Sequence, residues 1–403
     1  MAVDLTWEET EILSGKSGEG AALAMKIMVG IGEAFDARRL VKISRAHVAL
    51  SNQDGDLWFA EKLAGLGAKC RIPPTVNPGY NDAYFGPIGL STPEDDTFMQ
   101  RTFKAYQTLG AILNFSCTPY MFDNVPRMGE ILAYSESSNT PYVNSVWGAR
   151  TNREAAQSAL CAAVIGKVPE YGLLLTENRR ATVKVVVDAD LSDDFDYQLL
   201  GWATPKKIAH QIPMFVGMPS TVSPEALMNL GAQLNTAGAV SMYHIVGVTP
   251  EAPTEEAALH GKPPERTVRI TRRDLEEQLE SISQPAGPID FVMFGCPHFT
   301  LRQVQEIASM VKGKRLKTAM WVLTSSYTLE MAKRMGLWEI IENAGGHIVD
   351  NTCIDQPCWH HLAGKVGATD SPKCAYYTQR REMRLIIRSL RDCVEGALRG
   401  AIR

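Results

Sequence analysis

The stretch VKISRAHVALSNQDGDLWFAEKLAGLGAKCRI, residues 41–72, decides the class of fold. Short apolar runs at 41–43 and 47–50 predict a strand region, and a polar loop separates it from a predicted helix over 57–66. A further strand is predicted at 68–72. Because strands that alternate with helices build layered domains with a largely parallel sheet, we expect an α/β fold.

The same alternation continues on both sides of this stretch. Upstream, Thr6 and Glu9 form a capping-box pattern at the start of one helix, and a second helix is predicted over 21–35. The segment 251–265, rich in Pro, Glu and Ala, is predicted to be an exposed insertion or linker. Further strands are predicted at 110–115, 141–146, 182–187, 212–216, 239–248, 289–294, 318–324 and 347–349.

Composition excludes several classes of protein. With 45% hydrophobic and 21% charged residues, the 403-residue chain is neither disordered nor coiled-coil, and its 32 glycines do not suit collagen. A net charge of −4 and the absence of a basic stripe argue against a nucleic-acid partner. Apolar runs such as 159–165 are shorter than the roughly 20 residues that cross a bilayer, and the acidic N-terminus is not a secretory signal. We therefore expect a soluble, cytoplasmic protein with no membrane partner.

Three of the eight cysteines share one kind of position. Cys117, Cys296 and Cys353 each lie just beyond the end of a predicted buried strand. The carboxyl ends of strands in open α/β sheets converge on the binding crevice, so these thiols are candidates to meet at one point. No pair of cysteines has the C-x-x-C spacing of a zinc ribbon or a thioredoxin motif.

Three interpretations of these cysteines remain open from the pattern alone. Three converging thiolates suit an iron–sulfur cluster with one iron left open to a ligand. They also suit three inert core thiols, which are common in protein interiors. The third interpretation is a Cys₃His zinc site that uses His298 or His360.

Other polar residues have a structural and a functional interpretation. Asn144 and Ser145 follow a predicted strand, where they would either hydrogen-bond a ligand or cap the next helix. Arg150 and Arg153 offer planar donors to a carboxylate, or form an ion pair with neighbours such as Glu154.

Two histidines and one lysine complete the set of candidates. His47 and His244 lie inside apolar strands, so a hydrogen-bonded core histidine is expected for each rather than a catalytic one. Lys373 follows a proline in a loop, so its ammonium faces either a cleft or solvent.

Six motifs together resemble the aconitase X family, and they occur in the family's order over nearly the whole chain. They are SCTPY at 116–120, NSVWGARTNRE at 144–154, VPEYG at 168–172, HIVGVTPEA at 244–252, GCPH at 295–298 and DNTC at 350–353. The resemblance implies an α/β, aconitase-like fold, with residues 1–403 forming a catalytic large subunit of three α/β subdomains around a central cleft. It implies a hydro-lyase, that is, a dehydratase.

The resemblance also assigns a cofactor and a partner. It implies that Cys117, Cys296 and Cys353 hold an iron–sulfur cluster. Three cysteines suit both a [2Fe–2S] and a [4Fe–4S] centre. The branch of the family that dehydrates cis-3-hydroxy-L-proline favours [2Fe–2S]. No spare segment of suitable length remains for the swivelling domain of this superfamily, so we expect a separate small subunit. The catalytic base, a serine of that domain, is expected on the partner.

By the same resemblance, a set of residues lines the pocket for a small-molecule substrate. They are Ala49, Leu50, Ser51, Asn77, Pro78, Asn144, Ser145 and Lys373. Where the branch that dehydrates mevalonate 5-phosphate tends to have Gly-Val-Ser, this chain has the bulkier residues 49–51 before an acidic loop at 54–56. This difference favours the branch that dehydrates cis-3-hydroxy-L-proline, whose ring nitrogen is cationic.

Three alternatives to hydroxyproline dehydration stay open. The first is mevalonate 5-phosphate dehydratase, and the second is a non-catalytic iron–sulfur or zinc protein such as a redox sensor. A dinucleotide-binding oxidoreductase is disfavoured, because no predicted strand is followed by a convincing G-x-G-x-x-G.

Overall fold

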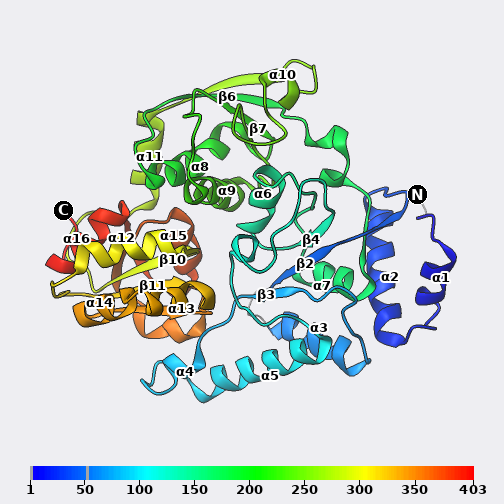
Figure 1. Cartoon of the computed structure of the whole chain (residues 1–403), viewed down its shortest axis with the longest axis horizontal. Helices are drawn as coiled ribbons and strands as arrows, with labels where there is room; N and C mark the ends of the chain where they lie inside the picture. The colour runs from blue at the N-terminus through cyan, green and yellow to red at the C-terminus, as the bar shows by residue number, and fades with distance from the viewer. Residues whose placement is uncertain (1–2, 51–53) are drawn as a thin grey trace.

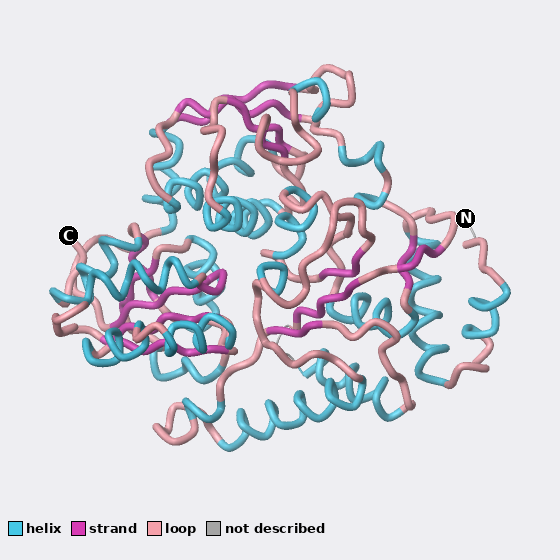
Figure 2. Tube along the Cα trace, viewed as in Figure 1, coloured by secondary structure: helices cyan, strands magenta, loops and turns pink. Residues whose placement is uncertain are grey.

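A computed structural model describes residues 3–50 and 54–403, which form three α/β units placed around the centre of the molecule (Figure 1). Figure 2 shows the strands of the three larger sheets as separate groups, each flanked by helices. No helix within the described residues is long and apolar enough to cross a membrane.

The first unit is built on a parallel three-stranded sheet of order β3-β2-β4, with an antiparallel pair, β1 and β5, beside it. Helix α7 packs against β2 and against α2 and α3. The elements are α1 (Trp7–Leu13), α2 (Glu19–Ala34), β1 (Leu40–Lys42), β2 (Arg45–Ala49), α3 (Asp54–Gly65), β3 (Thr75–Asn77), α4 (Asp82–Phe85), α5 (Pro93–Leu109), η1 (Pro119–Met121), β4 (Leu132–Tyr134), α6 (Asn139–Ser145), α7 (Ala156–Ile165), β5 (Lys167–Pro169), η2 (Gly172–Leu174) and η3 (Thr176–Arg179).

The second unit is a parallel four-stranded sheet of order β8-β7-β6-β9. Its helices α8 and α9 lie between this sheet and the rest of the molecule, and α9 contacts both α6 and α15 (Figure 1). The elements are β6 (Val183–Asp188), α8 (Asp194–Ile208), β7 (Pro213–Val216), α9 (Pro224–Gly238), β8 (His244–Ile245), α10 (Glu255–Ala258), β9 (Arg266–Thr271) and α11 (Arg272–Ile282).

The third unit is a parallel five-stranded sheet of order β12-β11-β10-β13-β14. From β10 the chain first builds toward β12 and then returns to add β13 and β14 on the other side, which makes the β10/β13 boundary a topological switch point. The elements are β10 (Phe291–Phe299), α12 (Leu301–Val311), β11 (Ala319–Thr324), α13 (Ser326–Arg334), α14 (Leu337–Ala344), β12 (Gly346–Asp350), η4 (Pro357–Leu362), β13 (Val366–Thr369), α15 (Pro372–Thr378), η5 (Gln379–Arg381), β14 (Arg384–Ile387) and α16 (Leu390–Arg399).

One hydrophobic core joins the first unit to the third. Phe85 of α4 packs edge-on against Trp359 with ring centroids 4.9 Å apart, and Trp359 packs against Trp321 at 5.4 Å. The amide of Asn81 donates to the carboxylate of Asp350 over 2.7 Å just beside these rings. The third sheet and the first unit therefore share one hydrophobic core, which holds the two units against each other.

The predicted α/β class is confirmed, and so are the strands predicted at 182–187, 212–216, 318–324 and 347–349. The prediction of a strand at 141–146 was wrong, because these residues belong to α6, whose seven residues are all buried. An apolar run this short does not distinguish a buried strand from a buried helix.

Two further strand predictions in the first unit were also wrong. Residues 68–72 are irregular, and their amides bond to Leu109 and Ala163 instead of to a strand. Within 110–115, Ile112 makes only an isolated bridge, to Thr75 of β3. The segment 251–265 connects β8 to β9 and carries α10.

Gly295 in β10 gives a test of how the sheet positions Cys296. Its φ is +104°, and an added Cβ would lie 2.2 Å from the carbonyl oxygen of Leu323. Gly295→Ala combines backbone strain with a backbone clash, so we expect a loss of about 3 kcal/mol in the free energy of unfolding.

Gly313→Ala is the matched control, because Gly313 also has a positive φ of +70° but no atom within 4 Å of an added Cβ. It should cost only about 1 kcal/mol. Guanidinium denaturation followed by circular dichroism measures both variants. Equal losses would show that the contact with Leu323 does not constrain this strand.

Candidate active site

A cavity of about 590 Å³ lies where strand ends of the first and third units meet. Its walls come from the residues that follow β2, β3 and β4 on one side and from the ends of β10, β12 and β13 on the other. The convergence follows from topology, because all of these strands lie in parallel sheets and β10 and β13 flank the switch point of the third.

Cys117, Cys296 and Cys353 all line this cavity. The backbone N–H of His298 donates to the Sγ of Cys117 over 3.2 Å, which is a contact that favours sulfur carrying negative charge. Burial raises the pKa of the Cys117 thiol to about 12, and the nearby Lys373 ammonium opposes that rise. The structure thus brings together the three cysteines that the sequence analysis singled out.

The three thiols interact electrostatically with one another. Each influences the ionisation of another, since Cys117 and Cys353 raise the pKa of Cys296 and Cys117 raises that of Cys353, after burial as the largest cause. Within 3–50 and 54–403, no group of three or more His, Cys, Asp or Glu side chains is arranged to hold one metal ion. An iron–sulfur cluster spans more space than one ion, because sulfides bridge its irons.

The zinc interpretation needs a histidine beside these thiols. The Nε2 of His298 donates to the carbonyl oxygen of Thr352 over 2.9 Å, and the Nδ1 of His360 lies 2.9 Å from the carbonyl oxygen of Pro357. His298 lines the cavity, whereas His360 is exposed outside its lining.

A buried ion pair crosses the cavity between the two units. The Nζ of Lys373, at the start of α15, lies 3.6 Å from Oε1 of Glu136, two residues beyond β4. Burial favours the neutral acid, but Lys373, Asn77 and Ser137 outweigh it and lower the pKa of Glu136 to about 2. Burial also opposes the charge of Lys373, whereas Cys296 and Glu136 raise its pKa. The cavity therefore holds a charged carboxylate and a charged ammonium near the three thiols.

Sequence reasoning missed Glu136. Only 13% of its side-chain surface is exposed, and it lines the cavity. The available signal was an acidic residue two positions after a short apolar run, Leu132–Tyr134, which is strand β4. A three-residue strand is too short to be detected by periodicity, so the residue that follows it had no predicted position.

Two arginines stand at the wall of the cavity. Arg380 donates from Nε to Oδ1 of Asp355 over 2.7 Å, and its second arm contacts the other carboxylate oxygen. Arg153 is exposed and lines the cavity, and its side chain makes no ion pair within the part of the chain that the structure describes. Arg153 is thus placed to receive the anionic group of a ligand.

The second unit supports the site without lining it. The Nε2 of Gln233, on α9, donates to Ser371 over 3.2 Å, and the Ser371 hydroxyl donates to the carbonyl oxygen of Cys296 over 2.6 Å. The backbone N–H of Lys373 donates to Oε1 of Gln233 over 2.9 Å. One buried amide therefore holds the backbone of both Cys296 and Lys373.

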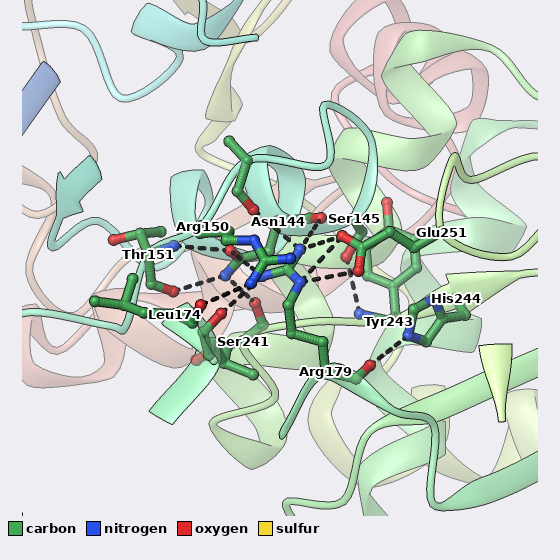
Figure 3. A network of polar contacts seen from close by, with 12 residues as sticks. Asn144, Ser145, Arg150, Thr151, Leu174, Arg179, Ser241, Tyr243, His244 and Glu251 are labelled. Atoms are coloured by element: carbon green, nitrogen blue, oxygen red, sulfur yellow. Dashed lines mark hydrogen bonds and ion pairs between the residues drawn. The ribbon is translucent and has the colours of Figure 1, made fainter. Parts of the chain in front are cut away.

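Five of the predicted pocket residues line the cavity, namely Ala49, Leu50, Asn77, Pro78 and Lys373. Ser51 lies outside the described residues. Asn144 and Ser145 do not line the cavity, and the structure places them in a separate polar network (Figure 3).

This network is centred on Arg179, whose side chain is fully buried (Figure 3). Arg179 donates to both carboxylate oxygens of Glu251 and to the backbone carbonyl of Asn144. The amide of Asn144 donates to the carbonyl oxygens of Thr151 at 2.9 Å and Ser241 at 3.0 Å.

Two more residues of the resemblance motifs belong to the same network. The hydroxyl of Ser145 accepts from the backbone N–H of Tyr243 over 2.8 Å, and Nε2 of His244 donates to the carbonyl oxygen of Arg179 over 2.8 Å. The motifs at 144–154 and 244–252 therefore join the first unit to the second.

Family models match the chain in order over its whole length. The aconitase X first domain matches residues 2–177, the second domain 181–280 and the third domain 289–399, in agreement with the three units. The chain belongs to the aconitase X family.

Similar proteins carry two names within this family. A phosphomevalonate dehydratase large subunit of Methanothermobacter thermautotrophicus is 37% identical, covering 92% of both chains. A cis-3-hydroxy-L-proline dehydratase of Pseudomonas aeruginosa is 34% identical, over 96% of this chain and 69% of the relative. The crystal structure of Thermococcus kodakaraensis aconitase X in its holo-form superposes with a TM-score of 0.90 at 32% identity, covering 98% of this chain and all of that one. The aconitase-like fold is thereby confirmed.

The buried imidazole of His47 predicts a pH dependence of stability. Burial lowers the pKa of His47 to about 4, whereas in the unfolded chain it is near 6.5. Between these values only the unfolded chain binds the proton, so stability falls as the pH is lowered from about 6.5 to about 4, by about 2 kcal/mol at pH 5. In His47→Gln the denaturation midpoint should change less between pH 7.5 and pH 5 than it does in the wild type. The surface variant His210→Gln should keep the wild-type pH dependence. An unchanged slope in His47→Gln would contradict this assignment.

The network in Figure 3 predicts a structural role for Asn144. Asn144→Ala leaves buried backbone groups of Thr151 and Ser241 without partners, so the free energy of unfolding should fall by about 3 kcal/mol. KM of the active complex should stay unchanged. Lys373→Ala should instead raise KM, because its ammonium faces the cavity. A raised KM in the Asn144 variant would return Asn144 to the substrate pocket.

Proposed function

We propose that the chain is the large subunit of an iron–sulfur dehydratase that eliminates water from a small hydroxy acid, with cis-3-hydroxy-L-proline as the preferred substrate. The observation that carries the proposal is one cavity lined by Cys117, Cys296 and Cys353 together with the buried Lys373–Glu136 pair. Thiolate ligands beside fixed charges suit an elimination in which charge develops on a carboxylate and on a departing oxygen.

The three cysteines would hold the cluster. When bound, an iron–sulfur cluster supplies a Lewis-acidic iron that stabilises the leaving hydroxyl group. The resemblance favours a [2Fe–2S] centre for the hydroxyproline branch, and three cysteine ligands also suit [4Fe–4S].

The charges in the cavity support a zwitterionic substrate. Lys373 faces Glu136 and Arg380 faces Asp355, so within the described residues Arg153 is the cavity-lining cation without a carboxylate partner. One such cation matches the single carboxylate of hydroxyproline, and the paired Glu136 lies in the same cavity, where its carboxylate would be shared between Lys373 and the cationic ring nitrogen. A substrate with both a phosphate and a carboxylate would need more positive charge.

The elimination follows from these placements. Arg153 binds the substrate carboxylate, and Lys373 stabilises the enolate-like charge that develops when the proton on the adjacent carbon is removed. The base takes the C2 proton, a C2–C3 double bond forms as the C3–O bond breaks, and the departing hydroxide takes up that proton and leaves as water. The enamine product then tautomerises to a cyclic imine.

A small partner subunit completes the proposal. Relatives are named large subunits, which supports a second chain that supplies the base. Tyr376 is 51% exposed at the cavity, so this wall is open to such a partner.

The alternative substrate is mevalonate 5-phosphate. The relative of Methanothermobacter thermautotrophicus that carries this name is 37% identical, against 34% for the hydroxyproline enzyme of Pseudomonas aeruginosa. Sequence identity therefore does not separate the two substrates, and the charge argument favours hydroxyproline.

Co-expression with the small subunit, followed by anaerobic assay of both substrates, tests the proposal. We expect kcat/KM for cis-3-hydroxy-L-proline to exceed that for mevalonate 5-phosphate by about 100-fold, corresponding to about 2.7 kcal/mol in transition-state binding. Turnover of the phosphate alone would reverse the assignment. A protein that binds iron but dehydrates neither compound would be a non-catalytic iron–sulfur protein.

The cysteine assignment has its own variants. Cys296→Ser should abolish both the visible absorbance of the cluster and turnover while the far-ultraviolet circular dichroism is retained. Cys70→Ser is the control, because Cys70 lies outside the cavity lining, and it should keep both properties. Full activity in Cys296→Ser would exclude the proposed cluster.

A further inference from the structure

We propose that His47, which is fully buried and does not line the cavity, is a positioning residue for the reaction: as the neutral Nε2–H tautomer it orients Asn77 so that the Asn77 amide holds the Glu136 carboxylate against Lys373. This inference rests on the proposed dehydratase function. It adds a residue that acts only through others.

Strand register brings these side chains together. His47 of β2 pairs with Thr75 of β3, and Ala49 pairs with Asn77. Residues two apart on a strand point to the same face, so Thr75 and Asn77 both face the imidazole of His47. On the other side β2 pairs with β4, and Glu136 lies two residues beyond the end of β4.

The direction of the hydrogen bonds is fixed from one end. The Nδ2 of Asn124 donates to the carbonyl oxygen of Ala46 at 2.8 Å and to Oγ1 of Thr75 at 2.9 Å. A carbonyl oxygen only accepts, so the amide orientation of Asn124 is determined by its environment. The Thr75 hydroxyl therefore accepts from Asn124 and is left to donate its own proton.

The carboxylate of Glu136 fixes the tautomer of His47 from the other end. A carboxylate only accepts, so the Asn77 NH₂ group faces Glu136 and its Oδ1 faces Nε2 of His47. The proton of the neutral ring is therefore on Nε2, and Nδ1 accepts from Thr75 over 2.8 Å. Nε2 then donates to Oδ1 of Asn77 over 2.5 Å. With its oxygen held in this way, Asn77 presents its NH₂ group to Oε2 of Glu136 over 2.9 Å.

The chain of bonds ends on the charged pair. Oε2 of Glu136 accepts from Asn77, while Oε1 accepts from the backbone N–H and the hydroxyl of Ser137 at 3.0 and 2.9 Å and lies near Lys373. Rotating the Asn77 amide by half a turn would place its oxygen against the carboxylate and its NH₂ against the Nε2–H of His47. His47 thus holds Asn77 in the one orientation that satisfies every group.

The first test reads the tautomer without any activity. We expect ¹⁵N NMR of the isolated chain, labelled at histidine, to show several neutral Nε2–H histidines at pH 7, His244 and His298 among them, and only one such signal to be lost in His47→Gln. A Nδ1–H or doubly protonated His47 would overturn the inference. If the wild-type complex dehydrates neither substrate, the proposed function fails, and this spectrum then decides the inference.

The second test reads the consequence for catalysis. His47→Asn loses the donor to Asn77, so we expect kcat to fall roughly 10- to 100-fold, with a smaller change in KM and with the cluster absorbance retained. Gln places an N–H where Nε2 was, so His47→Gln should recover kcat to within about 3-fold of wild type. Equal losses in the two variants, or no loss in His47→Asn, would overturn the positioning role.

His244→Asn is the matched control. His244 is also a buried histidine on a strand, and its Nε2 donates to the carbonyl oxygen of Arg179, away from the cavity. This variant should lower the denaturation midpoint and leave kcat unchanged. A fall in kcat equal to that of His47→Asn would attribute both effects to general loss of stability and would overturn the inference.

Discussion

The ion pair between Lys373 and Glu136 joins two units of the chain inside one cavity. Two charges removed from water in this way are stable only when each has other partners, because the desolvation penalty exceeds their mutual attraction. Glu136 has Asn77 and Ser137, and the backbone of Lys373 is held by Gln233. The first and third units therefore supply the charges, the second unit holds the backbone of one of them, and the three thiols line the same cavity.

Each unit makes a different contribution to the cavity that holds this ion pair. The first and third units supply the lining of the cavity, and their shared aromatic core fixes the distance across it. The second unit supplies Gln233, whose single amide binds the start of α15 at Lys373 directly and Cys296 of β10 through Ser371. Much of the chain thus holds a few polar atoms of the cavity in fixed positions. Catalysis by preorganised charges requires such fixed positions.

The sequence allowed the larger features to be predicted. Long apolar strands such as β11, Cys296 near the end of β10 and Cys353 just after β12 could be located because a parallel sheet buried on both faces leaves continuous apolar runs. The short elements of the first unit could not, since β4 has three residues and α6 is a buried helix that looks like a strand. Glu136 was not predicted, because the short strand β4 that precedes it was not predicted either. Asn144 and Ser145 were placed in the pocket because their motif resembles the family, but a motif does not distinguish a residue that binds substrate from one that holds Arg179.

The core shared by the first and third units has a consequence for synthesis on the ribosome. Phe85 emerges early, but Trp321 and Trp359, which complete its aromatic surroundings, are added only after the entire second unit has been translated. Until then the nascent first unit exposes an apolar surface that its own residues do not cover, and such surfaces promote aggregation. The order of the elements along the chain thus leaves the partners of Phe85 to be made last.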